Sequence, residues 1–160
     1  MRQGNLSNEQ SLYLQTIRKS SAHLLALIND VLDFSKIDAG KLELETAAFD
    51  LEEAIFDVMD MLSPLAAQKH IDMAFYYADS VPKHVIGDAL RFKQILTNLI
   101  SNAIKFTPDG EILVRARMEH EGIDRCVLHF SVQDSGIGLS GTDRKKLFES
   151  FSQGDTSVTR

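Results

Sequence analysis

Apolar residues recur with helical spacing over residues 7–39, which predicts one long helix. The sequence Ser7-Asn8-Glu9-Gln10 has the pattern of a capping box, and Gly40 stands where the helix should stop. A seam that steps alternately by three and four residues runs along Leu14, Ile17, Ser21, Leu24, Ile28, Val31 and Ser35. This spacing is typical of a coiled coil or bundle. One helix cannot bury this seam alone, so it needs a partner. Packing on another chain is favoured over packing on the rest of this chain, because a seam of this spacing and length is usually the seam of a helical bundle.

Strand-like and helix-like patterns alternate along the rest of the chain. Strands are expected at 41–45, 71–78, 111–119 and 125–133, and helices at about 51–69, 88–106 and 142–150. Asp50 caps the first of these helices, and the segment containing Pro82 is expected to be a loop. The last two strands should form an antiparallel hairpin. The predicted fold class is α+β, an α/β sandwich in which a mixed sheet carries helices on one face, preceded by the long helix.

The helix over 88–106 carries an unusual polar face within an arc of about 80°. This face contains Arg91, Gln94, Asn98, Asn102 and Lys105. Asparagine is a poor helix former, so two asparagines one turn apart need a reason. Their amide oxygens suit a hard cation such as Mg²⁺, and the lysine suits a phosphate. The alternative is a solvated polar face. A neighbouring apolar arc is expected to face the sheet and comprises Phe92, Ile95, Leu96, Leu99, Ala103 and Phe106.

A glycine-bearing loop, Asp134-Ser135-Gly136-Ile137-Gly138, follows the hairpin directly. Glycine lets the backbone approach a ligand closely, and the Asp134 carboxylate can accept a hydrogen bond from the exocyclic amine of adenine. The alternative is an ordinary turn. The loop is not the dinucleotide-binding fingerprint, because its third glycine and the following helix start do not fit. It is not a P-loop either, because no Gly-Lys-Ser/Thr follows.

Composition excludes several classes of function. The chain has 160 residues, of which 44% are apolar and 25% charged, as in a soluble globular domain. The net charge of −6 and the lack of a basic run exclude nucleic acid and anionic membrane as expected partners. The single cysteine, Cys126, excludes a disulfide framework, suits a reducing compartment and is expected in the core of its strand. We expect a cytoplasmic location, with any membrane anchor outside these residues.

The two motifs occur in an order that resembles a known family. Residues 98–107, the hairpin and residues 134–139 resemble the N box and first glycine box of histidine-kinase ATP-binding domains. Residues 147–153 resemble the F box, and residues 30–42 resemble the end of the second dimerisation helix of hybrid sensor kinases. The resemblance implies two domains. Residues 1–41 would be the second helix of a dimerisation and phosphotransfer hairpin. Residues 42–160 would be an ATP-binding domain of the gyrase, heat-shock chaperone, histidine kinase and mismatch-repair superfamily.

The resemblance also implies roles for the polar face of the helix. Asn102, helped by Asn98, would hold Mg²⁺ that bridges the nucleotide phosphates, and Lys105 would contact phosphate. Gln94 precedes these residues, where hydrolytic relatives carry a glutamate that activates water. Glutamine cannot act as a base, which favours phosphoryl transfer over hydrolysis.

Further roles fall on the loop and the C-terminal segment. Asp134 would bind the adenine amine, with Gly136, Ile137 and Gly138 forming the adjacent wall. The resemblance places Phe148 and Phe151 at the base of a lid over ATP, and Arg160 near the terminal phosphate.

The implied function is part of a two-component sensor histidine kinase that binds ATP and Mg²⁺ and transfers the γ-phosphoryl group to a histidine in a phosphorelay. The implied partners are a second copy, paired through the N-terminal helix, and a response-regulator receiver domain. The alternative is a non-catalytic dimerising or nucleotide-sensing module, and Gln94 and the leading helix argue against a superfamily ATPase.

Two features expected of a complete kinase are missing from this sequence. None of the five histidines precedes an acid and Arg-Thr-Pro, and His23 is expected to be a surface or seam residue. A second glycine box is also absent, so we expect a fragment that cannot phosphorylate itself.

Overall fold

The computed structural model describes residues 7–122 and 125–138. The chain divides into two compact units, Met1–Leu44 and Glu45–Arg160. The first contains the long helix, and the second contains helices and a mixed sheet, which confirms the predicted α+β class. Among the described residues, no helix is long and apolar enough to cross a membrane.

Helix α1 (Asn8–Asp38) begins and ends as the sequence predicted. The backbone N–H of Gln10 donates to Ser7 Oγ at 3.1 Å, and the N–H of Ser7 donates to Gln10 Oε1 at 3.0 Å. These two bonds form the predicted capping box. After the cap residue Ala39, Gly40 adopts a φ of 65°, a left-handed conformation that ends the helix at little cost for glycine.

The seam of α1 remains exposed within its own unit. Leu14, Ile17, Leu24, Ile28 and Val31 are each 46–60% exposed. In the described part of the first unit, α1 is the one helix, so its own unit offers no partner for this stripe. Pairing with another chain remains a prediction.

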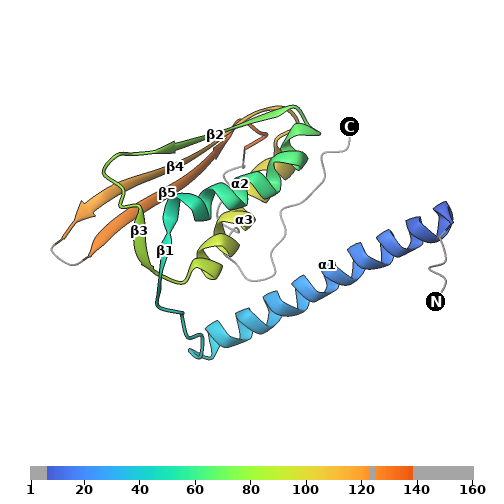
Figure 1. Ribbon diagram of the computed structural model, residues 1–160, viewed down its shortest axis with the longest axis horizontal. Helices are drawn as coiled ribbons and strands as arrows, with labels where there is room; N and C mark the ends of the chain where they lie inside the picture. The colour runs from blue at the N-terminus through green and yellow to red at the C-terminus, as the bar shows by residue number, and fades with distance from the viewer. Residues whose placement is uncertain (1–6, 123–124, 139–160) are drawn as a thin grey trace, which may run out of the picture. The chain divides into compact units, whose positions relative to one another are not determined.

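The second unit has the order β-α-β-β-α-β-β. Its elements are β1 (Ala47–Asp50), α2 (Leu51–Ala67), β2 (Ile71–Tyr77), β3 (His84–Gly87), α3 (Ala89–Phe106), β4 (Gly110–Glu121) and β5 (Cys126–Asp134). Strands β1 and β3 form an antiparallel pair, and a second sheet has the order β2-β4-β5. In that sheet β2 and β4 are parallel, and β4 and β5 form the predicted antiparallel hairpin. Figure 1 shows α2 and α3 on one face of this sheet, as predicted.

The core lies between the two helices and the three-stranded sheet. On β4 the alternate residues Ile112, Val114 and Ala116 are fully buried. They pack in one cluster with Ile100 of α3 and Ile55 of α2, which are also 0% exposed. Each large side chain buried in this way contributes about 1.5–3 kcal/mol. Side chains spaced by two residues on the strand and by about 3.6 on the helices therefore pack against one another at one interface.

One predicted strand is wrong. Residues 41–45 are irregular, and the strand β1 lies at Ala47–Asp50 instead. In the part of the chain that the structure describes, no strand pairs with residues 41–45, whereas Ala47 pairs with Gly87 of β3. Strand β3 itself was not predicted, because four residues after the loop at Pro82 carry too little pattern. The predicted helix over 142–150 lies outside the described residues.

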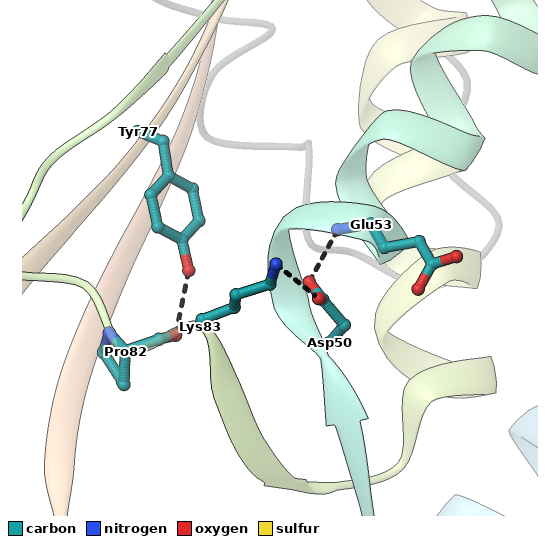
Figure 2. A network of polar contacts seen from close by, with 5 residues as sticks. All are labelled: Asp50, Glu53, Tyr77, Pro82 and Lys83. Carbon is teal, nitrogen blue, oxygen red and sulfur yellow. Dashed lines mark hydrogen bonds and ion pairs between the residues drawn. The ribbon is translucent and has the colours of Figure 1, made fainter.

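Polar contacts fix the start of α2, as Figure 2 shows. The cap residue Asp50 accepts the N–H of Glu53 at 2.9 Å and lies 3.5 Å from Lys83 Nζ. The hydrogen bond from Glu53 is the main reason that the pKa of Asp50 is lowered. Nearby, the Tyr77 hydroxyl donates to the carbonyl of Pro82 at 2.9 Å, and burial raises the pKa of this tyrosine. The connection before β3 is thereby joined to both β2 and α2.

Candidate functional site

The polar face of α3 presents two touching carboxamides. Asn98 and Asn102 are exposed, and Asn102 Nδ2 donates to Asn98 Oδ1 at 3.2 Å. This bond uses the amide nitrogen of Asn102 and not its carbonyl oxygen. The bond orients both side chains on the same exposed turn of the helix.

These two carboxamides could supply only part of the coordination shell of a cation. Among residues 7–122 and 125–138, no group of three or more His, Cys, Asp or Glu side chains could hold a metal ion. Two amide oxygens are hard donors of the kind that Mg²⁺ accepts, but they cannot complete its octahedral shell. The donor set therefore suits Mg²⁺ whose remaining ligands are waters and phosphate oxygens.

Two more predicted residues lie on this helix. The Lys105 Nζ lies 5.0 Å from the centroid of the Phe106 ring, a cation–π distance. Gln94 is exposed, and its Oε1 accepts a hydrogen bond from Arg91 Nη1 at 2.7 Å. Lys105 thus stands at the C-terminal end of the polar face, and Gln94 stands one turn before Asn98.

The loop over 134–138 is attached to both β4 and α3. Ser135 donates its N–H to the carbonyl of Glu111 at 3.1 Å, and its Oγ accepts the N–H of Glu111 at 2.9 Å. The N–H of Ile137 donates to the carbonyl of Phe106, the last residue of α3, at 3.3 Å. Within the loop, Asp134 Oδ1 accepts the N–H of Gly136 at 3.0 Å. The acid that begins the loop is thereby oriented by the loop itself.

Glycine is required at two positions of this loop for different reasons. A Cβ on Gly136 would lie 2.5 Å from the carbonyl oxygen of Phe106, closer than real Cβ contacts allow. Gly138 has open space around it but a φ of +67°, which other residues rarely adopt. The glycines were expected to let the backbone approach a ligand, whereas in the structure Gly136 lets the loop approach the end of α3.

The structure thus brings the two sequence motifs together at one corner. Asn102 lies one turn before Phe106, and Phe106 is bonded to the loop that Asp134 begins. Ile137 is 74% exposed beside this junction. Phe148, Phe151 and Arg160 lie outside the described residues. A hollow of about 380 Å³ elsewhere is lined by Asp50, Glu52, Glu53, Phe56 and Lys83 and contains none of the predicted site residues.

The predicted apolar face of α3 is partly wrong. Ile95, Leu99 and Phe106 are 63%, 45% and 43% exposed, although all three were expected to face the sheet. The buried stripe is rotated toward Ile100 and Ile104, because both α2 and the sheet pack against that side of the helix. The three exposed side chains therefore border the asparagines. Cys126 is also exposed, at the start of β5, and is not the predicted core thiol.

Two residues that join the corner were not singled out from the sequence. Lys69 follows α2 and donates to backbone carbonyls at the end of α3. Thr107 is 0% exposed directly after α3, where a Cβ on Gly136 would lie 2.9 Å from its Oγ1. No pattern in the chain marks either residue, because their contacts join segments that are distant in sequence.

Comparison with known families matches both parts of the chain. Residues 87–160 match the family "Histidine kinase-, DNA gyrase B-, and HSP90-like ATPase", which includes α3 and the loop over 134–138. Residues 1–40 match the "His Kinase A (phospho-acceptor) domain".

Curated relatives align over nearly the whole chain. The sensor histidine kinase GacS of Pseudomonas protegens is 46% identical over 160 residues, which is all of this chain and 17% of that protein. The signal transduction histidine-protein kinase BarA of Escherichia coli is 40% identical over 155 residues, 97% of this chain and 17% of that protein. The chain therefore spans about a sixth of these relatives.

Solved structures agree with this assignment. Full-length ShkA in complex with AMPPNP matches with a TM-score of 0.76 and 37% identity, over 94% of this chain and 31% of that one. Histidine kinase ThkA in complex with the response regulator TrrA matches with a TM-score of 0.61 and 26% identity, over 92% and 42%. The chain thus combines a segment of the His Kinase A phospho-acceptor domain with a domain of the histidine kinase-, DNA gyrase B- and HSP90-like ATPase family, and the relatives that it matches are sensor histidine kinases, hybrid kinases among them.

Proposed function

We propose that this chain binds ATP with Mg²⁺ between the polar face of α3 and the loop over 134–138. The observation that carries the proposal is the junction of these two segments. The Ile137 N–H bonds to the Phe106 carbonyl, and Gly136 approaches α3 too closely for any side chain. An acid on the loop and two carboxamides on the helix are thus held near one corner. The ATPase family match over residues 87–160 supports the same ligand.

Each residue has a role that its chemistry suits. Asp134 accepts a hydrogen bond from the exocyclic amine of adenine. Its Oδ1 already accepts the N–H of Gly136, and its second oxygen is the acceptor for the amine. Gly136, Ile137 and Gly138 form the wall beside the base. Lys105 meets a phosphate as a point charge. We retain Phe148, Phe151 and Arg160 as lid residues on the resemblance alone.

Asn102 and Asn98 would hold Mg²⁺ through their amide oxygens. When bound, the ion neutralises phosphate charge and orients the terminal phosphate. Gln94 lies one turn before Asn98 and is bonded to Arg91, and its amide cannot remove a proton from water. This supports transfer to an acceptor over hydrolysis.

For the whole protein we propose histidine autophosphorylation. The bond between the γ-phosphorus of ATP and its β,γ-bridging oxygen breaks, ADP leaves with that oxygen, and the γ-phosphorus forms a bond to a histidine nitrogen. The phosphoryl group then passes to a response-regulator receiver, which is the kind of partner seen with ThkA. We place this activity in the cytoplasm.

Dimerisation through α1 completes the proposal. Its seam residues are 46–60% exposed, and the phospho-acceptor family matches residues 1–40. Burying five such side chains against a second copy would offset the ordering cost of association.

Calorimetric titration with ADP and Mg²⁺ tests nucleotide binding. We expect Asp134→Asn to weaken ADP binding by about tenfold or more. An amide has one oxygen, so it cannot accept both the N–H of Gly136 and the adenine amine, and its N–H₂ group then faces one of these two donors. We expect Asn102→Ala to reduce the Mg²⁺ dependence of ADP binding and to leave metal-free ADP affinity within about twofold. Arg115→Gln, which breaks a bond to Gln133 on the sheet, is the matched surface control. Equal affinities in all four proteins would contradict the assignment.

A second candidate is a dimerising module without nucleotide chemistry. The exposed seam of α1 favours it. It would be supported if the wild-type chain formed a dimer and bound neither ADP nor ATP in the same titration.

A further inference from the structure

Lys69 reaches from one element of the fold to the end of another. It lies in the turn between α2 and β2, and its Nζ donates to three backbone carbonyls at the end of α3. The acceptors are Ile104 at 2.6 Å, Lys105 at 3.0 Å and Thr107 at 3.3 Å. The side chain is partly buried there. A single ammonium group thus uses all three of its donors on one helix terminus.

The end of α3 needs such a group. The last carbonyls of a helix have no partners within the helix, and they carry the negative end of its dipole. Lys105 is the basic residue of the last turn, but its Nζ lies over the Phe106 ring. The cation that binds these carbonyls is therefore Lys69, from the turn that follows α2, which leaves the ammonium of Lys105 for another ligand.

The turn that carries Lys69 is itself well fixed. Its N–H donates to the carbonyl of Ala66 at 3.0 Å, and the N–H of His70 donates to Ala67 at 3.1 Å. His70 adopts a φ of 57°, which is uncommon for a residue other than glycine. The next residue, Ile71, already pairs with Gly110 in the sheet. The backbone of Lys69 is thus held between α2 and the first sheet pair.

The carbonyls that Lys69 binds lie next to the contact with the loop. Phe106, whose carbonyl accepts the N–H of Ile137, stands between Lys105 and Thr107. Gly136 packs against Phe106 and against the buried Thr107. If the last turn of α3 moved, the loop over 134–138 would have to move with it or lose its contacts with Phe106 and Thr107.

We propose that Lys69 is a positioning residue for the nucleotide site, which fixes the last turn of α3 against the loop that Asp134 begins. This inference rests on the proposed function. Lys69 touches neither nucleotide nor metal in this account. It acts by holding the backbone from which Lys105 projects, one turn beyond Asn102, at a fixed place relative to Asp134.

Removal of the ammonium should loosen this corner. Three carbonyls lose their donor and must turn toward water, so the last turn frays. The bond between Ile137 and Phe106, already 3.3 Å long, then loses its fixed acceptor. Nucleotide affinity should fall, because a ligand that contacts both segments needs their spacing to be correct.

The test uses Lys69→Met with Lys93→Met as the matched control. Lys93 also joins α3 to α2, through a 2.6 Å contact with Asp57, but near the other end of the helix. Lys69→Arg keeps the charge and several donors. Lys69→Gln keeps two donors without the charge and replaces Lys69→Met if the latter does not fold. Each protein is titrated with Mg²⁺ and ADP well below its unfolding temperature, and amide hydrogen exchange is followed in the peptide that covers residues 134–138.

We expect Lys69→Met to weaken ADP binding about tenfold and to speed exchange in the loop, as loss of a supporting contact does at other sites. Lys93→Met should change affinity by less than about twofold, and Lys69→Arg should recover most of the loss. A Lys69→Met protein that is less stable but binds ADP like Lys93→Met would show a merely structural role and overturn the inference. A wild-type chain that does not bind ADP would instead overturn the proposed function, and the positioning role with it.

Discussion

The contact between Gly136 and α3 allows a sharp test of how the loop is built. Gly136→Ala adds one methyl group. Its carbon would lie 2.5 Å from the Phe106 carbonyl oxygen and 2.9 Å from both Thr107 Oγ1 and Asp134 Oδ1. Two of these neighbours, Phe106 and Thr107, belong to the end of α3, which Lys69 holds in place. The backbone carbonyl cannot rotate away as a flexible side chain would, so the loop must move.

The size of the effect follows from the distances. Ordinary van der Waals contact begins near 3.4 Å, so the loop must retreat by about 0.9 Å. A shift of that size breaks the 3.3 Å bond between Ile137 and Phe106. Overpacking of this kind costs about 1–3 kcal/mol and the lost bond about 1 kcal/mol. The stiffer unfolded chain of the alanine variant returns about 0.4–1 kcal/mol. The expected loss of unfolding free energy is therefore about 1–3.6 kcal/mol.

Urea unfolding followed by circular dichroism measures this loss, with two glycines as matched controls. A Cβ on Gly87 meets only Phe49 at 3.7 Å, so Gly87→Ala should change the unfolding free energy by less than about 1 kcal/mol. Gly138→Ala has open space but a φ of +67°, and should cost about 1–2 kcal/mol through backbone strain alone. If Gly136→Ala unfolds at the same urea concentration as Gly87→Ala, the close approach of loop and helix described above is wrong.

Three further substitutions test the N-cap of α3, its buried face and the seam of α1. The pKa of Asp88 is lowered from 3.8, first by the N–H of Arg91 and then by that of Glu45. The ionised carboxylate stabilises the folded state fully above pH 3.8, and this stabilisation is lost as the pH falls through the lower pKa of the folded state. The Tm of Asp88→Asn should therefore fall less steeply than that of the wild type as the pH is lowered through this range. Identical curves would contradict this. Ile100→Ala should cost about 2–5 kcal/mol in urea unfolding, but the exposed Ile95→Ala less than about 1 kcal/mol. Equal losses would mean that the buried face of α3 is misassigned. Ile28→Glu in the α1 seam should convert a dimer to a monomer in sedimentation velocity, and an intact dimer would place the interface elsewhere.

Strong local patterns predicted much of this fold. The capping box at Ser7, the cap at Asp50 and the hairpin of β4 and β5 are all present, because each depends on residues close in sequence. The strand expected at 41–45 is absent because strand formation here depends on pairing with residues that are distant in sequence. Strand β1 exists because it pairs with β3, and that pairing is invisible to a search for alternation.

The sequence indicated the side chains of the candidate site but not the contacts that hold them in place. The asparagines and the loop glycines were found from their spacing, but their support was not. Lys69 supports the end of α3 through backbone carbonyls, which any sequence provides, so nothing in the residues around 104–107 signals it. Ile95 and Leu99 were assigned to the core because periodicity fixes an apolar arc only to within one residue, while the sheet decides which side is buried.

The proposed function requires that one nucleotide contacts both α3 and the loop over 134–138. Titration of Mg²⁺ and ADP into the ¹⁵N-labelled chain tests this directly, since each segment has its own signals. We expect the signals of the side-chain amides of Asn98 and Asn102 and of the backbone amides of residues 136–138 to shift together, with one dissociation constant. Shifts confined to one of these segments, or to the hollow beside Asp50 and Lys83, would contradict it.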